Sequence, residues 1–338
     1  MKKRNTILFM FVVLVSISFI IGCTDQSKEV NKGNRDNSGL STIRYGGQHY
    51  PGEYVLAGDP GIWTENGISV EHTLFSSGAE NNEALISGNV DINAGSDTKS
   101  NALFNAMPGE VVLIGTLQRG NRYSTIVRSD SDIESWDDLR GKTIATRFGT
   151  GAESVIRKYY DQNGYSWDDF KYVNLKIEDM SAALEQGQID AFTAWEPTPA
   201  IAEAKGIGRV MRTYGDVSLV PVCLHTTKKY AAGHENEIVH FLAAHLDKAE
   251  LIKNNPKEAA QIASDAASAG GIEIDPLAFE KIFERIDFNL DIDEDVISSI
   301  KETGEFLVEQ GKIKSVPEIE FDESYLIKAK ELREKGSY

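Results

Sequence analysis

Segments typical of strands and of helices alternate along most of this chain, and that alternation limits the folds open to it. Residues 68–75 alternate apolar and polar side chains as a half-buried strand does. Residues 78–87 are typical of a helix, which Gly88 stops, and residues 90–94 and 111–115 are the next predicted strands. Because strands that alternate with helices form layers with mostly parallel sheets, we predict an α/β fold.

Further predicted elements continue this pattern to the end of the chain. Other predicted strands lie at residues 43–46, 123–128, 143–145, 172–175 and 189–194, and other predicted helices at residues 54–66, 152–163 and 179–186. After residue 226 we predict helices, with interruptions at Pro256, Gly270, Pro276 and residues 287–295. A unit of helix, glycine and Ile/Val-Asp strand occurs twice, at residues 83–92 and 183–191. The repetition favours two similar α/β lobes, with chance similarity of a common unit as the alternative.

The first 23 residues have the features of a bacterial signal peptide. The basic head Lys2-Lys3-Arg4 precedes a run of mostly apolar residues that ends at Gly22-Cys23. The run is shorter than the roughly 20 apolar residues that a helix needs to cross a bilayer, so we interpret residues 1–22 as a signal peptide. The small residue before Cys23 is similar to a lipobox. We therefore predict lipid on Cys23 and an extracytoplasmic, membrane-anchored protein, with an ordinary secretory signal as the alternative.

The segment after the signal peptide is polar. Residues 24–41 contain Asn, Ser, Gly and mixed charges and show no hydrophobic period. Such a composition is typical of a flexible tether, which we predict over residues 23–41. The folded part is predicted to begin near Thr42.

Charge and cysteine content limit the partners of this chain. The formal net charge is −17, and a strongly acidic surface argues against nucleic acid as a partner. After Cys23 only Cys223 remains, so the mature chain has no internal disulfide and no zinc site of the CxxC type. We predict no cofactor and no metal.

Short motifs occur where the predicted elements place them. They are Gly95-Ser96-Asp97, Ile-Glu-Ser-Trp-Asp-Asp-Leu-Arg-Gly-Lys over residues 133–142, Gly149-Thr150-Gly151, Trp195-Glu196-Pro197, and Asn-Pro-Lys-Glu-Ala over residues 255–259. With the lipobox, these motifs make residues 42–329 resemble the extracytoplasmic solute-binding proteins of ABC importers. The resemblance is to the group that binds nitrate, sulfonates, taurine and thiamine-pyrimidine precursors. Several of these pieces occur in many periplasmic-binding folds, so they indicate the fold more than the ligand.

The resemblance implies a two-lobed, periplasmic-binding-protein-like fold of type II, in which each lobe is a mostly parallel sheet flanked by helices. By analogy, residues 42–120 form lobe I and residues 121–225 form lobe II. Residues 226–338 provide the hinge return and the C-terminal helices that complete lobe I. The hinge is expected near residues 119–121 and 224–229. The resemblance also implies a small-molecule ligand, an ABC permease as partner, and a monomer.

Ligands in open α/β sheets bind beyond the carboxyl ends of the strands. Where a helix begins there, its unpaired N–H groups and partial positive charge suit an oxyanion. The candidate ligand-binding residues are Gln48, Tyr50, Ser76, Ser77, Gly78, Ser96, Asp97, Arg119, Phe148, Gly149, Thr150, Gly151, Trp195 and Glu196. For Ser76, Ser77, Thr150 and Gly151, helix capping requires the same geometry and is the alternative interpretation.

The aromatic and charged candidates each have two interpretations. Trp195 either stacks on the ligand or packs in the core. Glu196 would repel an anion, unless it pairs with Arg147 or binds an amine such as the ammonium group of taurine. A surface or hinge salt bridge is the alternative interpretation of Glu196. Arg119, Arg122 and Arg147 are the cationic candidates, with a solvated surface role as the alternative.

Motifs for catalysis and for calcium binding are incomplete. Residues 149–154 lack the third glycine of GxGxxG, and the chain contains no GxSxG or GxxxxGK[ST]. Residues 287–291 begin like an EF-hand loop, but Ile292 replaces the turn glycine and Ser298 the bidentate glutamate. We interpret this segment as a loop with capping acids.

We predict a lipid-anchored binding protein, not an enzyme, that captures a small oxyanion such as an alkanesulfonate, taurine or nitrate. The runner-up ligand is an aminopyrimidine thiamine precursor. It would require aromatic walls, for which the candidates are Tyr50, Tyr123, Phe148 and Trp195, and a carboxylate such as Asp97 or Glu196. An enzyme on the same scaffold and a sensory protein that presents its ligand to a receptor are further alternatives. The chain contains residues for both ligand classes.

Overall fold

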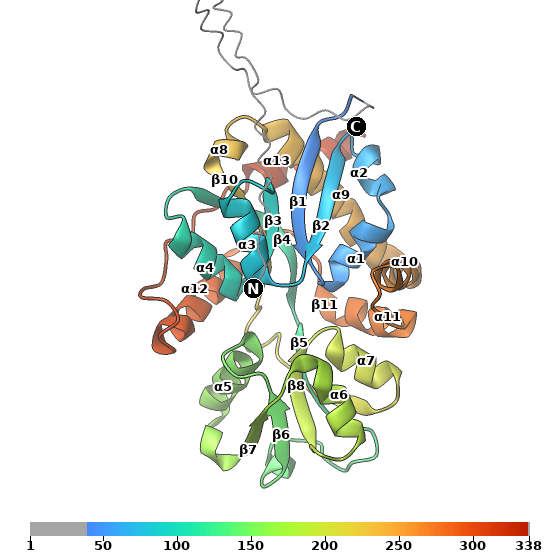
Figure 1. Cartoon of the computed structure of the whole chain (residues 1–338), viewed down its shortest axis with the longest axis vertical. Helices are drawn as coiled ribbons and strands as arrows, with labels where there is room; N and C mark the ends of the chain where they lie inside the picture. The colour runs from blue at the N-terminus through green and yellow to red at the C-terminus, as the bar shows by residue number, and fades with distance from the viewer. Residues whose placement is uncertain (1–38, 337–338) are drawn as a thin grey trace, which may run out of the picture. The chain divides into compact units, whose positions relative to one another are not determined.

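The computed structural model describes residues 39–336, which build two separate β-sheets flanked by helices (Figure 1). The predicted signal peptide, Cys23 and the predicted tether up to residue 38 lie outside the described residues. Within residues 39–336, no helix has the length and apolar character needed to cross a membrane.

The first sheet has six strands in the order β11-β4-β10-β3-β1-β2. Its strands are β1 (Thr42–Gln48), β2 (Ser69–Phe75), β3 (Ile92–Ser96), β4 (Val111–Gly120), β10 (Val222–Thr227) and β11 (Ile286–Asp287). The helices of this part, which we call the first lobe, are α1 (Pro51–Gly58), α2 (Gly61–Glu65), α3 (Gly78–Ile86), α4 (Asp97–Ala106), α8 (Lys228–Ala231), α9 (Glu235–Asn254), α10 (Pro256–Ala269), α11 (Pro276–Arg285), α12 (Glu294–Glu309) and α13 (Ser324–Lys335).

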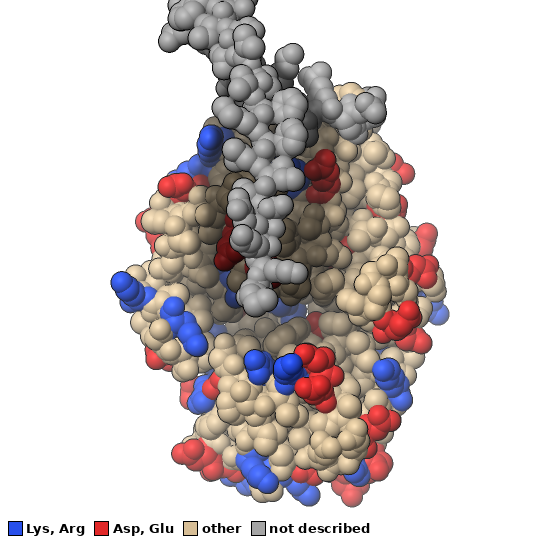
Figure 2. Space-filling view, in the orientation of Figure 1, with Lys and Arg blue, Asp and Glu red and all other residues tan. Residues whose placement is uncertain are grey.

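The second sheet has five strands in the order β7-β6-β8-β5-β9. Its strands are β5 (Tyr123–Arg128), β6 (Thr143–Thr146), β7 (Lys171–Asn174), β8 (Ala191–Trp195) and β9 (Gly208–Thr213). The helices of this second lobe are α5 (Gly151–Asn163), α6 (Ile177–Glu185), α7 (Thr198–Ala204) and the short 3-10 turns Asp137–Leu139 and Trp167–Asp169. On the face shown in Figure 2, acidic and basic side chains are interspersed over both lobes.

Both sheets are mixed, which corrects the expectation of mostly parallel sheets. β1 pairs parallel with β2 and β3, but β10 pairs antiparallel with β3 and β4. In the second sheet β6 pairs parallel with β7 and β8, but β5 pairs antiparallel with β8 and β9. Parallel neighbours need a crossover connection, usually a helix. β5 and β10 each follow a passage from the other sheet instead of a crossover helix. Each begins at the edge where its parallel-paired neighbour, β8 or β3, ends, and therefore runs antiparallel to that strand.

The chain crosses between the sheets twice. The first crossing, between the end of β4 and the start of β5, lies at residues 121–122, next to the predicted hinge at 119–121. The second lies at residues 214–221, because β10 already belongs to the first sheet. The predicted end of the second lobe at residue 225 is therefore wrong, as is the predicted hinge segment 224–229, which lies within β10 and α8.

Most predicted elements are present, with small shifts at their ends. The single helix predicted over residues 54–66 is two helices, α1 and α2, because Pro60 has no N–H to continue a helical hydrogen-bond pattern. The elements that were not predicted include α4, α7, β9 and the two-residue strand β11. The absence of α4 from the prediction affects the site, as described below.

Each sheet has its own apolar core. Ile43 and Leu224 of the first sheet pack with Phe241 of α9, whereas Ile144 of β6 packs with Tyr160 of α5 in the second lobe. A further cluster joins α1, α10 and α11, and Ala200 of α7 packs into it. The two lobes therefore have separate cores and touch where α7 meets α11.

Candidate functional site

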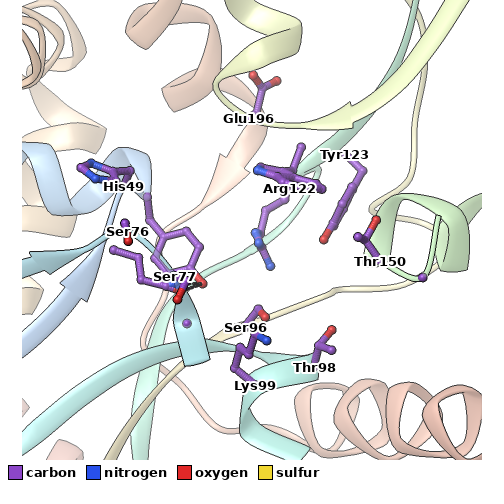
Figure 3. Close-up of a pocket in the computed structure, with 16 residues that line it drawn as sticks. His49, Ser76, Ser77, Ser96, Thr98, Lys99, Arg122, Tyr123, Thr150 and Glu196 are labelled. Atoms are coloured by element: carbon purple, nitrogen blue, oxygen red, sulfur yellow. Dashed lines mark hydrogen bonds between the residues drawn. The ribbon is translucent and has the colours of Figure 1, made fainter. Parts of the chain in front are cut away.

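A cavity of about 330 Å³ lies where strand ends of both sheets face each other. We call it the cleft. It is lined by Gln48, His49, Tyr50, Ser76, Ser77, Gly78, Ser96, Thr98, Lys99, Arg122, Tyr123, Gly149, Thr150, Gly151, Trp195 and Glu196. Most of these residues follow the carboxyl ends of β1, β2, β3, β6 and β8, where the strand rule places a ligand. In Figure 3, Ser77 and Thr150 come from opposite sides, with Arg122 between them.

Three helices begin at the cleft. Ser77 caps α3 by accepting a hydrogen bond from the Glu80 N–H at 3.3 Å. Thr150 caps α5 by accepting one from the Ala152 N–H, also at 3.3 Å, whereas Ser96 precedes α4 with no side-chain cap bond. Helix starts carry unpaired N–H groups and a partial positive charge, so the starts of α3 and α5 favour a negative ligand, whereas the start of α4 already carries the Asp97 carboxylate.

The two capping hydroxyls, Ser77 and Thr150, differ in whether they already donate a hydrogen bond. The Thr150 hydroxyl donates to the carbonyl oxygen of Arg147 at 2.6 Å, so its proton is already used within the loop. Among residues 39–336, no acceptor takes the Ser77 proton, which therefore stays available to a ligand. The Ser76 hydroxyl, by contrast, donates to Glu80 Oε2 at 2.7 Å.

Arg122 is the buried cation of the cleft. Its residue is 4% exposed, and its Nη1 donates to the carbonyl oxygen of Val220. The guanidinium lies over the rings of Tyr50 and Tyr123, with its central carbon 5.6 and 5.5 Å from the ring centres. No carboxylate in the described part of the chain forms an ion pair with it.

Lys99 adds a second positive charge from the start of α4. Its side chain is half-buried and has no ion-pair partner within residues 39–336. Gly78 makes room for it: a Cβ at this position would lie 2.7 Å from Lys99 Cγ and 2.8 Å from Gln48 Oε1. A glycine at the start of α3 therefore lets the Lys99 side chain and the Gln48 amide come close to that helix end.

Glu196 lines the cleft, yet its carboxylate is held from the other side. Oε1 accepts a hydrogen bond from Arg285 Nη1 at 3.0 Å, and Oε2 accepts one from the Ala200 N–H at 3.0 Å. Burial raises the pKa of Glu196 to about 7, against the opposing effect of the Arg285 charge. Of the interpretations of Glu196, the structure shows the salt bridge, and its partner is Arg285 rather than Arg147.

Aromatic rings form part of the cleft wall. Trp195 is half-buried and meets Tyr123 edge to face, with ring centres 6.4 Å apart. Tyr50 exchanges hydrogen bonds with Gln48, whose Oε1 accepts from the Tyr50 hydroxyl at 3.0 Å. Burial raises the pKa of Tyr123 to about 12, so its hydroxyl remains a neutral hydrogen-bond donor at physiological pH.

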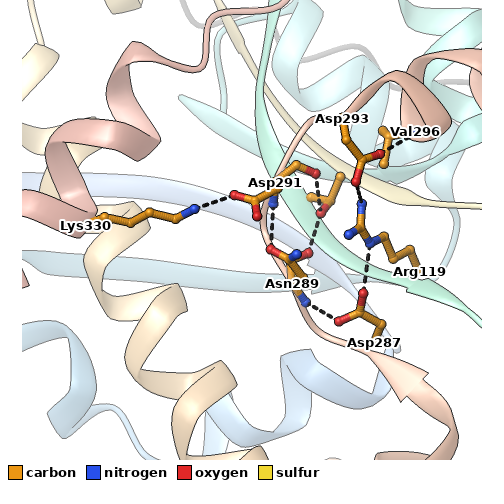
Figure 4. A network of polar contacts seen from close by, with 8 residues as sticks. Arg119, Asp287, Asn289, Asp291, Asp293, Val296 and Lys330 are labelled. Carbon is orange, nitrogen blue, oxygen red and sulfur yellow. Dashed lines mark hydrogen bonds and ion pairs between the residues drawn. The ribbon is translucent and has the colours of Figure 1, made fainter.

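Three predicted site residues do not line the cleft. Asp97 is buried behind it, where its carboxylate accepts hydrogen bonds from the Thr303 hydroxyl at 2.7 Å and the Thr98 N–H at 2.8 Å. Phe148 is 41% exposed and packs edge to face against Trp167. Arg119 forms ion pairs with Asp287 at 2.9 Å and Asp293 at 2.6 Å, outside the cleft (Figure 4).

The segment that pairs with Arg119 is the EF-hand-like stretch, and its interpretation as a loop with capping acids is confirmed. Asp287 accepts from the Asn289 N–H at 2.9 Å, and Asp293 accepts from the Val296 N–H at the start of α12. Asp291 pairs with Lys330 (Figure 4). No group of three or more potential metal ligands occurs within residues 39–336.

Five lining residues were not among the predicted site residues: His49, Thr98, Lys99, Arg122 and Tyr123. Arg122 and Tyr123 were considered from the sequence but not selected. Thr98 and Lys99 depend on α4, for which the sequence analysis had no helix. The signal that was present is Ser96-Asp97, a typical helix start, followed by Leu103 and Phe104 about two turns later.

Comparison with known proteins identifies the family to which this chain belongs. A family model described as NMT1/THI5 like matches residues 48–259, which is more than half of the chain. The chain belongs to the NMT1/THI5-like family. The "Putative aliphatic sulfonates-binding protein" of Bacillus subtilis (strain 168) is 26% identical to this NMT1/THI5-like protein over 304 residues, which are 87% of this chain and 88% of the relative.

Two further comparisons agree with it. The taurine-binding periplasmic protein of Escherichia coli (strain K12) is 27% identical over 291 residues, which are 81% of this chain and 88% of the relative. The crystal structure of the periplasmic aliphatic sulphonate binding protein SsuA from Escherichia coli matches with a TM-score of 0.70 at 19% identity. It covers 82% of this chain and 90% of that chain.

The structural match confirms the predicted periplasmic-binding-protein-like fold. The family resemblance drawn from the motifs is confirmed as well. The relatives above are named as binding proteins, which confirms the prediction of a binding protein rather than an enzyme.

Proposed function

We propose that this NMT1/THI5-like protein is the substrate-binding component of an ABC importer and captures a small sulfonate in the cleft. The observation that carries the proposal is the buried guanidinium of Arg122, which lines the cleft without a carboxylate partner among the described residues. A buried charge without a counter-ion is costly, and an anionic ligand supplies the counter-ion. The half-buried amine of Lys99 supports the same ligand charge from a second element.

The helix starts at the cleft provide directed hydrogen-bond donors in addition to the charges of Arg122 and Lys99. A sulfonate has three oxygens, and α3 and α5 begin at the cleft from the two lobes, whereas the Thr98 N–H at the start of α4 is already bound to Asp97. The named ligands of the two relatives, aliphatic sulfonates and taurine, agree with that donor set. Nitrate, a smaller oxyanion, is the second ligand that the donors suit.

An aminopyrimidine is the weaker candidate for this cleft. It would require a free carboxylate beside the aromatic wall of Tyr50, Tyr123 and Trp195. Glu196 is the only carboxylate that lines the cleft in the described part of the chain, and it is bound to Arg285 and to the Ala200 N–H. Two cations without an ion-pair partner among residues 39–336 would also face a ligand that carries no negative charge.

The work of such a protein is capture and delivery, with no bond broken. The chain passes between the lobes at residues 121–122 and 214–221, so these two segments are our candidates for the hinge. A ligand that contacts both lobes stabilises the closed arrangement, which a permease then recognises. The lipid on Cys23 belongs to this proposal. Cys23→Ser should move the protein from the membrane fraction to the soluble fraction, and retention in the membrane fraction would contradict the anchor.

A thermal-shift panel tests the function. The purified protein is heated with ethanesulfonate, taurine, nitrate or an aminopyrimidine. A ligand that binds the folded state at about 100 times its Kd adds about 2.7 kcal/mol and raises the melting temperature. We expect a rise with a sulfonate, and no rise in Arg122→Gln. A rise with the aminopyrimidine alone would replace the proposed ligand class.

A further inference from the structure

The cleft carboxylate Glu196 has a partner that lies outside the cleft. Arg285, the last residue of α11 in the first lobe, donates through Nη1 to Glu196 Oε1 at 3.0 Å. Its other nitrogen, Nη2, pairs with Glu203 of α7. One arginine of the first lobe therefore holds two carboxylates of the second lobe.

This ion pair lies in a buried contact between the lobes. The Glu196 side chain is 1% exposed and the Arg285 side chain 17%. Next to it, Ala200 of α7 packs into the apolar cluster that contains Phe279 and Phe283 of α11, and Figure 1 shows the two helices side by side. Water screens such a pair far less than a surface pair, so breaking it leaves an uncompensated buried charge.

A second ion pair between the lobes provides a comparison. Lys158 of α5 pairs with Glu302 of α12 at 2.9 Å, and the Glu302 side chain is 48% exposed. Neither residue lines the cleft. Lys158 and Glu302 can therefore report on the general effect of losing one contact between the lobes.

The charges decide what a ligand meets in the cleft. Lys99 and Arg122 attract an anion, and Glu196 is the one lining carboxylate within residues 39–336. A ligand ammonium that sought this carboxylate would have to replace Arg285 and would leave Arg285 with Glu203 alone. Ethanesulfonate has no ammonium group and can bind without displacing Arg285. Taurine is the same molecule with an added ammonium group. Selectivity between the two sulfonates therefore depends on the inaccessibility of the Glu196 carboxylate as well as on the attraction of the sulfonate group by Lys99 and Arg122.

We propose that Arg285 is a positioning residue for ligand selection: by holding the Glu196 carboxylate it makes the cleft favour sulfonates without an amino group over aminosulfonates. The proposal rests on the proposed function, because it presupposes that sulfonates bind in the cleft. It deepens that function by naming the class of sulfonate.

The test is the ratio of two affinities in the purified protein, measured by isothermal titration calorimetry with ethanesulfonate and with taurine. The wild type should bind ethanesulfonate about tenfold more tightly or better, because taurine must break a buried ion pair. Arg285→Gln releases Glu196 toward the cleft, so this ratio should fall by about tenfold or more. Lys158→Gln, the matched control, should leave the ratio unchanged.

Two more variants separate positioning from folding. Glu196→Gln together with Arg285→Gln leaves no unpaired carboxylate at the cleft, so the preference for ethanesulfonate should return. Arg285→Lys keeps the charge but cannot hold both carboxylates with a planar fork, so the ratio should lie between those of wild type and Arg285→Gln. Circular dichroism and melting curves establish which variants fold.

Each outcome bears on one level of the account. A wild type that binds taurine as well as ethanesulfonate, or better, overturns the selectivity role of Arg285 and leaves sulfonate binding in place, even where Arg285→Gln does not fold. A folded Arg285→Gln with an unchanged ratio overturns it as well. Binding of neither sulfonate by the wild type overturns the proposed function, and the inference with it.

Discussion

The two walls of the cleft are built alike and differ in chemistry. On the first-lobe wall, α3 and α4 begin at Ser77 and Ser96, and the half-buried amine of Lys99 stands beside them. On the second-lobe wall, α5 begins at Thr150, whose hydroxyl already donates to the Arg147 carbonyl oxygen. The rings of Tyr123 and Trp195 also belong to this wall.

This difference indicates how the cleft divides a ligand. The first-lobe wall and Arg122 provide charge and free donors, which suit the sulfonate head. The second-lobe wall provides apolar ring surface, which suits an alkyl tail. A helix start alone therefore does not define an anion site. A helix start is expected to bind the anion where its capping hydroxyl still has a free proton and a cation without an ion-pair partner lies nearby.

The largest effect should come from Arg122. Arg122→Gln removes the buried charge that faces the ligand anion, and binding of ethanesulfonate should weaken by about 100-fold or more. Calorimetry measures the loss. Arg119→Gln is the matched control three residues away, because Arg119 is bound to Asp287 and Asp293 outside the cleft. Equal losses in the two variants would mean that Arg122 acts on folding rather than on the ligand.

Lys99 should come next. Lys99→Met keeps the length of the side chain and removes its charge from the first-lobe wall, so ethanesulfonate should bind about tenfold more weakly. The loss should shrink as salt is added, because Lys99 is only half-buried. Lys142→Met, an exposed lysine of the second lobe, should bind ethanesulfonate like the wild type. A Lys99→Met protein with wild-type affinity would remove this amine from the site.

The two capping hydroxyls give a smaller and sharper contrast. Ser77→Ala should weaken ethanesulfonate binding about fivefold, because a free donor is lost. Thr150→Ala should change it by less than about twofold, since that proton is already bound to Arg147. Both changes remove a cap and should cost about 1 kcal/mol of stability, which melting curves can verify. The reverse order of affinities would assign the sulfonate to the second-lobe wall.

The smallest effect should be that of pH. Burial raises the pKa of Glu196 from 4.5 to about 7, so the carboxyl becomes charged as pH rises through about 7. That added negative charge beside the cleft should weaken ethanesulfonate binding about two- to threefold between pH 6 and pH 8. The folded protein holds this proton more tightly than the unfolded chain, so stability should also fall as pH rises from about 5 to about 7.

Glu196→Gln is the control for this pH effect. The groups that face Glu196 are Arg285 and Glu203, and His49, Lys99 and Arg122 also line the cleft. A profile that stays the same in Glu196→Gln would assign the pH dependence to another of these groups.

Local patterns were enough to predict part of the site. Ser77 and Thr150 each follow a strand and precede a helix within a few residues, so their places at helix starts follow from neighbouring sequence. Gly78 and Trp195 follow in the same way from strand ends. The strand–helix alternation likewise predicted the α/β fold, but not the antiparallel pairing of β10, which is set by residues more than 100 positions away from β3.

The residues that were missed depend on distant contacts. The buried face of α4 includes the polar residues Ser100 and Asn101, and the Asn101 amide donates to the Ile300 carbonyl oxygen of α12 at 2.8 Å. A helix with a polar buried face has a weak hydrophobic period, so Lys99 was not placed. Neighbouring residues do not distinguish Arg119 from Arg122, because the carboxylates that bind Arg119 lie 168 and 174 residues further along the chain.

A crystal structure of the protein with ethanesulfonate would test the central claim most directly. The account predicts that the sulfonate oxygens lie within hydrogen-bonding distance of the Arg122 guanidinium and the Lys99 amine, with the ethyl group toward Tyr123 and Trp195. A sulfonate bound instead by the N–H groups of Gly149–Gly151, with Arg122 still turned to the Val220 carbonyl, would contradict it.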